Sequence, residues 1–407
     1  MKKAVLKSHN TLRQCTGCLA CLDSCNHGAI QSRIDDRGHI VPLFDKNKCI
    51  DCGRCDAVCP IITIETTSIN DSQPYAAWSL NNEIRKDSAS GGIFSALALK
   101  VINEGGYVSG AIIEGCVVKH IVTNSIEDIN KIQGSKYQQG HLEGVYREIK
   151  ERLKEEKKVL FSGTPCQVAA IKRFFKHGRF ADNLITIDFF CGGFPSILPL
   201  ESFKKNCGFE IKRIVSFRNK DNGWKAVGYN YCFQVEDAYG QLHSFGDNNI
   251  VSRAFISHLT NRDSCLNCKF ATPNRSSDIT IGDYWGCKNY LEQEELGISV
   301  VVVHNQQMID LLESAGIVLN PIKWKDFVMN NPRAVIGKFH GFHLHWVNRL
   351  YSYLFKKLSY KTICALFGVG SLSYGMKINN LLFRVIKKAD KTIKKYRIKQ
   401  ILKGLDK

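Results

Sequence analysis

One cysteine spacing occurs twice within the first sixty residues of this chain. The first run is Cys15-x2-Cys18-x2-Cys21-x3-Cys25, and the second is Cys49-x2-Cys52-x2-Cys55-x3-Cys59-Pro60. This spacing is typical of a ferredoxin module with two [4Fe–4S] clusters, in which three cysteines of a run bind one cluster and the fourth binds the other. The predicted ligand sets are Cys15, Cys18, Cys21 and Cys59 for one cluster, and Cys49, Cys52, Cys55 and Cys25 for the other.

Two other uses of cysteine fit this pattern poorly. A zinc site would need two separated cysteine pairs, and a disulfide framework belongs to small secreted domains. One detail departs from the usual pattern, because Asn26 rather than proline follows Cys25. Proline is not a ligand, so this weakens the expected turn and leaves the metal ligands unchanged. The sequence therefore predicts iron–sulfur clusters.

The size and composition of the chain indicate an ordinary globular protein. Its 407 residues suffice for two or three domains, and 44% of them are hydrophobic and 23% charged. Seventeen cysteines indicate a reducing compartment in which thiolates are kept for metal. The first residues lack the apolar core of a signal peptide, and no run of about 18 apolar residues occurs. These features predict a cytoplasmic protein.

Three segments follow one another along the chain. Residues 1–66 form the two-cluster module, a polar linker from Thr66 to Gln73 leads to Pro74, and residues 331–407 are helical and basic. Between them, over 74–330, strand and helix signals alternate, which predicts a mixed α/β domain and an α+β chain overall. Expected strands are 75–80, 107–113, 159–161, 184–190, 278–282 and 299–303, and expected helices are 92–104, 141–156 and a segment ending at 175.

Half of the net charge of +18 lies at the C-terminal end. Residues 377–407 contain eleven Lys or Arg and two Asp, a balance of +9. Apolar side chains recur there at helical spacing, at Leu382, Ile386, Ala389, Ile393 and Tyr396. Such a helix can dock on its own domain, or rest on an acidic partner or the anionic inner membrane surface. No nucleic-acid-binding motif accompanies the charge, so we predict no contact with nucleic acid.

Four more cysteines lie where α/β sheets place ligands, at strand ends and helix starts. Cys166 follows a strand in Gly163-Thr164-Pro165-Cys166-Gln167, Cys191 ends a strand, and Cys265 and Cys268 form a CxxC pair. These thiolates could hold a third cluster, or could be buried free thiols with one incidental CxxC. We assign no role to the spare thiols Cys116, Cys207, Cys232, Cys287 and Cys364, or to His340, His343 and His345.

Two short loops suit a phosphate-bearing cofactor. Ser88-Ala89-Ser90-Gly91-Gly92 opens a helix, where small residues let an anion approach free N–H groups. Gly134-Ser135-Lys136-Tyr137 offers a cation, a hydroxyl and an aromatic ring. Both are also ordinary turns, and the chain lacks GxGxxG and a P-loop. The candidate contacts with a flavin or its substrate are Ser90, Gly91, Gly92, Ser135, Lys136 and Tyr137.

Together these motifs resemble those of one family, the beta subunits of coenzyme F420-reducing hydrogenases and F420 dehydrogenases. The resemblance covers roughly residues 10 to 330 and rests on segments 88–92, 134–137, 163–167, 190–192, 265–268 and 278–286. It implies bound FAD and iron–sulfur clusters that exchange electrons with an organic substrate. Proteins of similar build include hydroxymethyl-chlorophyll reductases and polysaccharide-biosynthesis proteins, so the resemblance does not identify the substrate.

We therefore expect a flavin-dependent iron–sulfur oxidoreductase acting on an organic substrate or a deazaflavin-type coenzyme, within polysaccharide biosynthesis in one reading. Lys136 and Asp283 are its candidate proton donors, and a redox protein such as reduced ferredoxin is its expected partner. Two alternatives remain open. The chain could be an electron-transfer subunit without a substrate of its own, or a cluster protein held at a membrane surface by its basic tail.

Overall fold

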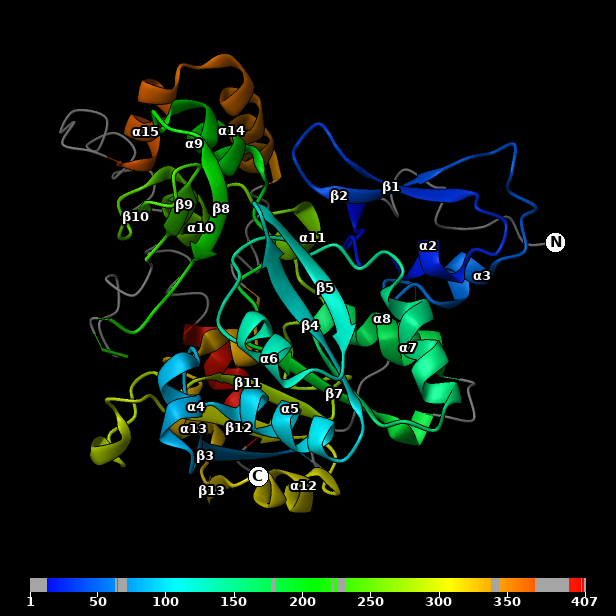
Figure 1. The fold of residues 1–407 in the computed structure, drawn as a ribbon, viewed down its shortest axis with the longest axis vertical. Coiled ribbons are helices and arrows are strands. Elements are labelled where there is room, and N and C mark those ends of the chain that lie inside the picture. Colours follow the sequence, from blue (N-terminus) through cyan, green and yellow to red (C-terminus); the bar gives the residue numbers. More distant parts are fainter. Residues whose placement is uncertain are drawn as a thin grey trace.

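The computed structural model describes residues 13–62, 64, 72–176, 181–221, 223–224, 232–337, 345–369, 395–403 and 405. These residues form a small cysteine-rich module, a domain built on an eight-stranded sheet, and a lobe with a three-stranded sheet and helices (Figure 1). The module and the lobe lie on the same side of the large sheet, at different ends of it. The predicted ferredoxin module, mixed α/β domain and helical C-terminal region are thus confirmed. The domain boundaries stay predictions.

The cysteine-rich module is a hairpin flanked by two short helices. Strands β1 (Ile30–Ile34) and β2 (Ile40–Phe44) pair antiparallel. Helices α2 (Ala20–Ser24) and α3 (Arg54–Ala57) each contain the third cysteine of a run. Leu19, Cys21, Leu22, Ile30, Ile40 and Cys59 form the buried core of the module. So small a core suggests that metal ligation contributes much of the stability of the module.

The large sheet has the strand order β13-β3-β12-β11-β7-β6-β4-β5. Its strands are β3 (Gln73–Ser79), β4 (Tyr107–Glu114), β5 (Val117–Thr123), β6 (Val159–Ser162), β7 (Leu184–Phe189), β11 (Ile279–Asp283), β12 (Ser299–Val303) and β13 (Ile317–Pro321). Strands β4, β6, β7 and β11 are parallel to one another, and the remaining pairs are antiparallel. Four carboxyl ends therefore meet at one edge of the sheet, where open α/β sheets bind ligands.

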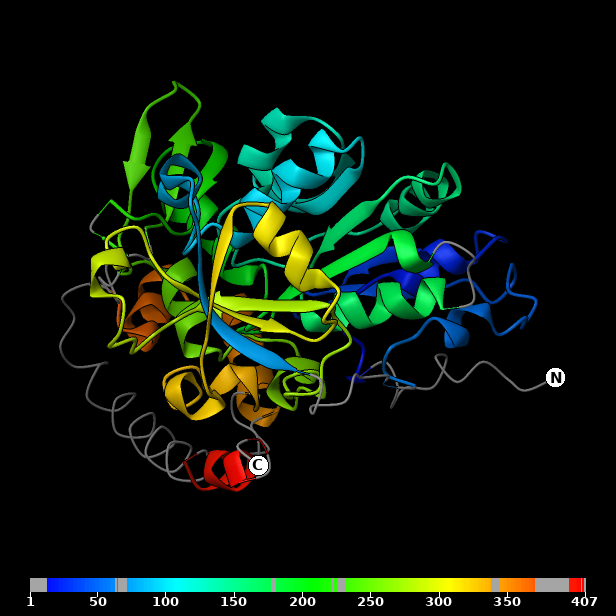
Figure 2. The same cartoon turned by 90° about the horizontal axis from the view of Figure 1, so that it is seen from below.

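Both faces of this sheet are covered, which explains its apolar strands. Helices α4 (Asn82–Asp87), α5 (Ile93–Asn103), α6 (Ile126–Ile132) and α12 (Met308–Ser314) cover one face (Figure 2). Helices α7 (Val145–Lys154), α8 (Pro165–Phe175) and α13 (Trp324–Phe327) cover the other. In β12, Val301 and Val303 pack in the core beneath α5, and Val300 and Val302 pack on the opposite face, in the core that contains α13. A strand buried on both sides is a continuous apolar run rather than an alternating one.

The lobe joins segments that are far apart in the sequence. Strands β8 (Ile211–Ser216), β9 (Gln234–Asp237) and β10 (Leu242–Ser244) form an antiparallel sheet. Helices α9 (Leu198–Asn206), α10 (Ile250–Ser257), α14 (His345–Lys357) and α15 (Tyr360–Phe367) pack beside it. Phe203, Phe233, Ile250 and Ile363 share its core. Four short helices lie in the connections between these elements: η3 (Ala181–Asn183), α11 (Asp263–Leu266), η4 (Leu291–Gln293) and η5 (Pro332–Ala334).

Part of the predicted basic helix can be placed. Residues 395–403 are helical, and Ile398 is buried in the core that contains Trp78 and Trp324, while Tyr396 is exposed. This end of the tail therefore docks on its own domain, one of the alternatives left open by the sequence. Leu382, Ile386, Ala389, Ile393, His340 and His343 lie outside the described residues. Among the described helices, none has the length and apolarity to cross a membrane.

Candidate functional site

The two cysteine runs share one backbone geometry. In the first run Gly17 (φ 68°) and Leu19 (φ 62°) flank Cys18, and in the second Asp51 (φ 55°) and Gly53 (φ 76°) flank Cys52. Left-handed backbone is costly for Leu and Asp, so it persists only where the surrounding structure requires it. Turns of this hand on both sides of the central cysteine bend each run back on itself. The repeat seen in the sequence is therefore also a repeat in the fold.

The first cluster site combines both runs. Burial raises the pKa of Cys21 well above its ordinary value, and the neighbouring thiols Cys18, Cys15 and Cys59 raise it further. Burial, followed by Cys18, raises the pKa of Cys59 to about 12. Cys59 thus lies with the first run, as the predicted crossover requires. Closely packed buried thiols hold their protons in the absence of metal, and iron binding would release them.

The second cluster site lies closer to the surface. Burial raises the pKa of Cys55 to about 11, with smaller contributions from Asp56 and Cys49. Cys25 and Cys55 both pack against the module core, and Cys52 is exposed. No three His, Cys, Asp or Glu side chains in the described residues converge as the ligands of a single ion would. Four thiolates of a cubane stand apart, since each binds a different iron atom. The assignment of each thiol to a cluster stays a prediction.

The second cysteine set also gathers in space. Burial raises the pKa of Cys166 well above its ordinary value, and Cys191, Cys268 and Cys265 raise it further. Cys191 follows β7, and Cys166 lies in the first turn of α8, where Thr164 and Gln167 form a capping box. The four thiols come from three loops at the carboxyl edge of the sheet. This arrangement favours the third-cluster reading over four unrelated free thiols.

The surroundings of the second cysteine set suit a buried anionic centre. The backbone N–H groups of Gly193 and Phe194 donate to the sulfurs of Cys191 and Cys265, each over 3.3 Å. Arginines also lie nearby: Arg333 and Arg275 lower the pKa of Cys191, and Arg262 that of Cys265, although burial outweighs them. N–H donors and cations stabilise thiolate-bound iron and tune its reduction potential. These are properties expected of cluster ligands.

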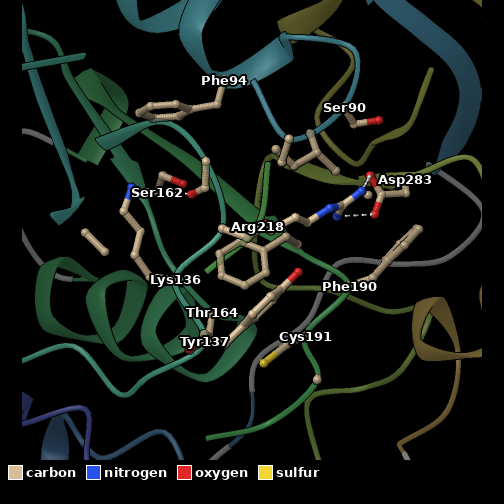
Figure 3. Close-up of a pocket in the computed structure, with 18 of the residues that line it drawn as sticks. Ser90, Phe94, Lys136, Tyr137, Ser162, Thr164, Phe190, Cys191, Arg218 and Asp283 are labelled. Carbon is tan, nitrogen blue, oxygen red and sulfur yellow. Dashed lines mark hydrogen bonds and ion pairs between the residues drawn. The ribbon is translucent and has the colours of Figure 1, made fainter. Parts of the chain in front are cut away.

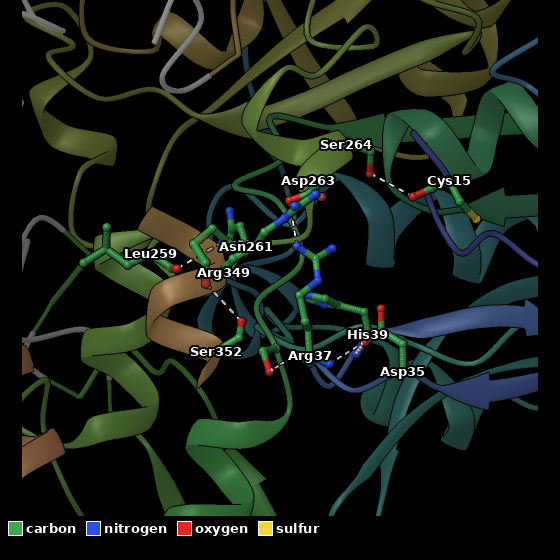
Figure 4. Close-up of polar contacts among 12 residues, drawn as sticks. Cys15, Asp35, Arg37, His39, Leu259, Asn261, Asp263, Ser264, Arg349 and Ser352 are labelled. Atoms are coloured by element: carbon green, nitrogen blue, oxygen red, sulfur yellow. Dashed lines mark hydrogen bonds and ion pairs between the residues drawn. The ribbon is translucent and has the colours of Figure 1, made fainter. Parts of the chain in front are cut away.

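The first cluster loop is bonded directly to the loop of the second cysteine set (Figure 4). The carbonyl oxygen of Cys15 accepts hydrogen bonds from Arg262 Nη1 at 3.1 Å and from Ser264 Oγ at 3.0 Å. Ser264 immediately precedes Cys265 in helix α11. Arg37 Nη1 also donates to Asp263 Oδ1 over 2.7 Å, which ties the hairpin to the same helix. The module is therefore held with the ligand loop of its first cluster site against α11, the helix that contains Cys265.

A second attachment lies at helix α7. The carboxylate of Asp23 accepts from the backbone N–H groups of Gly144 at 2.8 Å and Tyr146 at 2.9 Å, and so caps a helix more than a hundred residues away in sequence. The Tyr146 hydroxyl donates to the Cys18 carbonyl over 2.9 Å. Arg147 donates to the carbonyl oxygens of Asp23, Leu22 and Cys25. These contacts, of which the Tyr146 hydrogen bonds are buried, make the module an integral part of the domain rather than a tethered carrier.

A cavity of about 560 Å³ opens at the carboxyl ends of β6, β7 and β11 (Figure 3). Its volume is within the range of small-molecule sites. The predicted residues Ser90, Gly92, Ser135, Lys136, Tyr137 and Asp283 all line it. Cys191 lines it as well and so belongs both to the cavity wall and to the second cysteine set. The structure therefore gathers both predicted loops around one space next to the candidate third cluster.

Gly91 is the one predicted cofactor residue that does not line the cavity. Its N–H group donates to Ser299 Oγ at 3.0 Å, and a Cβ there would lie 2.6 Å from the Ala77 carbonyl oxygen. The absence of a side chain therefore serves the contact of this loop with β3 and β12. Gly92 caps α5 with a φ of 82° and does face the cavity. Helix α5 thus directs its N-terminal end, which favours anions, toward the cavity.

Lys136 lies on the side of the cavity near Ser162 (Figure 3). Its Nζ donates to the carbonyl oxygens of Gln133 and Ile132 at the end of α6. Burial lowers the pKa of Lys136 to about 7. The nearby His120 also lines the cavity, and burial followed by the Lys136 charge lowers its pKa to about 3. Near neutral pH this side therefore holds a neutral imidazole and a readily titrating amine.

Arg218 and Asp283 form a buried ion pair on the opposite side (Figure 3). Arg218 Nη1 lies 2.9 Å from Asp283 Oδ2, and the Trp224 indole N–H donates to the other carboxylate oxygen over 3.4 Å. Burial alone would lower the pKa of Arg218, but Asp283 and Tyr137 raise it. Arg218 also lies 5.6 Å from the centroid of Trp285. Arg218 was not among the residues predicted from the sequence, because it stands outside every motif and follows β8, a strand with exposed positions that was not predicted either.

Comparison with known proteins identifies the family. Residues 14–61 match the 4Fe-4S dicluster domain. Residues 74–146 and 156–319 match the N-terminal and C-terminal parts of the coenzyme F420 hydrogenase/dehydrogenase beta subunit. No curated protein matches. A solved structure, the xenon-derivatised F420-reducing [NiFe] hydrogenase complex from Methanosarcina barkeri, contains a similar chain, at 19% identity and a TM-score of 0.44 over 66% of this chain and 88% of that one.

The family models for the N-terminal and C-terminal parts of one subunit thus follow a dicluster domain, in the order that the sequence motifs predicted. The resemblance is confirmed, and so are the oxidoreductase class and the two [4Fe–4S] clusters. The chain belongs to the coenzyme F420 hydrogenase/dehydrogenase beta-subunit family, as an iron–sulfur oxidoreductase with an N-terminal dicluster domain for electron transfer.

Proposed function

We propose that this chain binds a flavin in the cavity and a third [4Fe–4S] cluster at Cys166, Cys191, Cys265 and Cys268, and that it oxidises or reduces an organic substrate. One observation carries the proposal: Cys191 belongs to the second cysteine set and also lines the cavity. The Cys15 loop is bonded beside Cys265 on the other side of that set. The second cysteine set therefore lies between the dicluster domain and the cavity, so no mobile carrier would be needed to take electrons from one to the other.

The chemistry of the two cofactor types explains why they would occur together. Clusters carry single electrons, whereas a flavin exchanges electrons singly or in pairs, so that together they would connect one-electron carriers to a substrate that reacts in two-electron steps. The family description makes a deazaflavin-type coenzyme one candidate for that substrate. Nothing in the cavity or in the comparisons favours a polysaccharide precursor, so that reading is not proposed here.

The residues of the cavity can be given distinct roles in this proposal. Gly92 and Ser90 place a small, donor-bearing loop at the N-terminal end of α5, which suits a flavin phosphate. Lys136 suits proton donation, because its lowered pKa brings it near neutral pH. Asp283 is bound to Arg218 and Trp224, so we assign it to orienting Arg218 rather than to donating a proton. Arg218 would then present a fixed cation to the bound flavin or substrate.

The experiment that tests this function is the anaerobic determination of iron, sulfide and flavin in the purified chain. Three clusters would give about twelve iron atoms and twelve sulfides, together with one flavin released on denaturation. About eight iron atoms with one flavin would remove the third cluster from the proposal and leave the flavin. About eight iron atoms and no flavin would overturn the proposed function, and the chain would then be a substrate-free electron-transfer subunit.

Lys136 predicts a pH dependence of flavin binding. Because burial lowers its pKa to about 7, Lys136 is charged below that pH and loses its charge above it. If its Nζ contacts an anionic group of the ligand, affinity should fall as the pH rises from about 6 to about 8.5, and the bound anion should displace this fall to somewhat higher pH. FAD affinity measured by fluorescence quenching should show this slope in the native chain and not in Lys136→Met. An equal slope in both would remove Lys136 from the binding site.

A further inference from the structure

Of the proposed cluster ligands, the one exposed to solvent belongs to the second cluster site. All seventeen cysteines lie in described residues, and only Cys52 among them is exposed. Cys21 and Cys59 of the first site are buried in the module core, and Cys18 is buried against α7 and α8. The second cysteine set is partly buried. A protein that exchanges electrons with this chain must bring its own centre close to a cluster. The loop around Cys52 is where the chain offers that approach.

The side chains around Cys52 form a small apolar spot. Ile50, two residues before it, is 55% exposed, and Ala57 at the end of α3 is also exposed. Gly53, with a φ of 76°, has nothing within 4 Å of the position of a Cβ, so the backbone there is open to a partner. Weak electron-transfer complexes use small contact surfaces, and an exposed apolar residue next to the ligand loop can form the centre of one. Cys52 and Ile50 are both exposed to solvent, so a cluster held by Cys52 would lie next to this spot.

The most exposed charged side chains around this spot are all basic, although the segment also contains three partly buried carboxylates. The exposed charged side chains of residues 45–57 are Lys46, Lys48 and Arg54. The three carboxylates of the segment, Asp45, Asp51 and Asp56, are all less exposed, and Asp45 lies 3.9 Å from Lys48. The whole chain carries a net charge of +18, which adds a long-range field of the same sign. A partner that meets this surface is therefore attracted if it is acidic and repelled if it is basic.

We propose that the surface formed by Ile50, Cys52 and the basic side chains Lys46, Lys48 and Arg54, here called the Cys52 face, docks a small acidic one-electron carrier protein. One electron crosses in each encounter: the carrier loses it and the adjacent cluster gains it, or the reverse, and no bond or proton changes place. This inference deepens the proposed function by naming the class of partner. It rests on the dicluster domain and its electron transfer, and it does not require the flavin.

The test compares two charge-reversed variants of the full chain that have the same net charge. The first is Lys46→Glu/Lys48→Glu/Arg54→Glu on the Cys52 face. The matched control is Lys205→Glu/Lys357→Glu/Lys361→Glu, which changes exposed lysines of α9, α14 and α15 on the distant lobe (Figure 1). An acidic plant-type [2Fe–2S] ferredoxin, reduced beforehand, serves as the protein donor. Reduced methyl viologen, a small cationic donor, reports whether the clusters themselves remain intact.

Stopped-flow bleaching of the cluster absorbance measures the rates and needs no substrate. At low ionic strength the Cys52-face variant should be reduced by ferredoxin at least about tenfold more slowly than the native chain, and its rate should depend less on salt. The control variant should stay within about twofold of the native rate. Reduction by methyl viologen should not slow in either variant, and iron content should be unchanged. Titration with oxidised ferredoxin should show a parallel loss of affinity in the first variant alone.

Three outcomes would overturn the inference. Equal slowing of both variants would mean that net charge, rather than the Cys52 face, attracts the carrier. A native ferredoxin rate in the Cys52-face variant would place the docking site elsewhere. An absence of ferredoxin binding and reduction in the native chain, with methyl viologen active, would exclude an acidic carrier as the partner. If the triple variant loses iron, two variants that leave α3 untouched replace it: Ile50→Asp and Lys46→Glu/Lys48→Glu. Their ferredoxin and methyl viologen rates are then judged in the same way.

Discussion

Replacement of Cys265 by alanine is expected to remove about four of about twelve iron atoms from the chain and to leave the flavin bound. Cys265 is suited to this test because it belongs to the second cysteine set and, unlike Cys191, does not line the cavity. Its loss would leave one iron of the proposed buried cube without a protein ligand, and we expect the incomplete cube not to assemble; loss of that iron alone would instead leave a [3Fe–4S] centre. Anaerobic iron and sulfide analysis, with electron paramagnetic resonance of the reduced protein, measures the change.

The same variant should disconnect the dicluster domain from the cavity. With two clusters retained, reduced ferredoxin or methyl viologen should still bleach part of the cluster absorbance, whereas reduction of the flavin by this route should be lost. Cys207→Ala is the matched control, because Cys207 lies in the lobe, where its thiol contacts the carbonyl oxygens of Lys204 and Phe209. A Cys265→Ala chain with native iron content would contradict the third cluster. Loss of flavin with unchanged iron would instead show that α11 shapes the cavity.

Removal of Arg218 is expected to be the most destabilising single change in the cavity wall. The side chains of Arg218 and Asp283 are 8% and 17% exposed, so Arg218→Met leaves a nearly buried carboxylate without its cation. Loss of one partner of a buried pair typically costs about 3–5 kcal/mol, whereas replacing both partners with apolar side chains is often close to neutral. Arg218→Met/Asp283→Leu should therefore recover much of the stability lost in Arg218→Met.

Urea unfolding followed by tryptophan fluorescence can measure this difference. Trp224 donates to Asp283 and stacks on Trp285 with ring centroids 5.0 Å apart, so two indoles report on the pair directly. Lys154→Met provides the surface comparison: its partner Glu151 is 59% exposed, and such pairs contribute about 0–1 kcal/mol. A cost for Arg218→Met as small as that for Lys154→Met would mean that the pair is solvated. A double variant less stable than the single one would mean that Asp283 is held by other donors.

Most strands of the large sheet could be predicted from the sequence, whereas those of the lobe could not. The strand–helix alternation gave the main elements of the large sheet, because strands buried on both faces, such as β12, are apolar throughout and stand out in a sequence. The three strands of the lobe were missed. Strands β8 and β10 have several exposed positions, so their residues carry little apolar signal. Their core is completed by α14 and α15, more than a hundred residues further along the chain.

Some residues of the candidate site could likewise be predicted from the sequence and others could not. Lys136 and Tyr137 could be proposed from one short loop, because their chemistry is local to it. Arg218 could not, because its role depends on Asp283 and Tyr137, which reach it from other elements. Gly91 looked like a cofactor contact from its neighbours, yet it faces Ala77 and Ser299 behind the loop. The direction in which a loop residue points is decided by what packs against it, and sequence spacing does not contain that information.

For the two cluster sites of the dicluster domain, the sequence alone determined the ligand types and their spacing, since three closely spaced thiolates of each run must converge on one cube and the fourth must reach the other. The repeat of left-handed backbone around Cys18 and Cys52 is the physical expression of that spacing. Only the tertiary structure decided where the module sits and what it connects to. Those contacts, from Asp23 to helix α7 and from the Cys15 loop to Arg262 and Ser264, join residues more than a hundred positions apart. Burial and hydrogen bonding between such distant segments hold the dicluster domain in a fixed position beside the second cysteine set, of which Cys191 also lines the cavity.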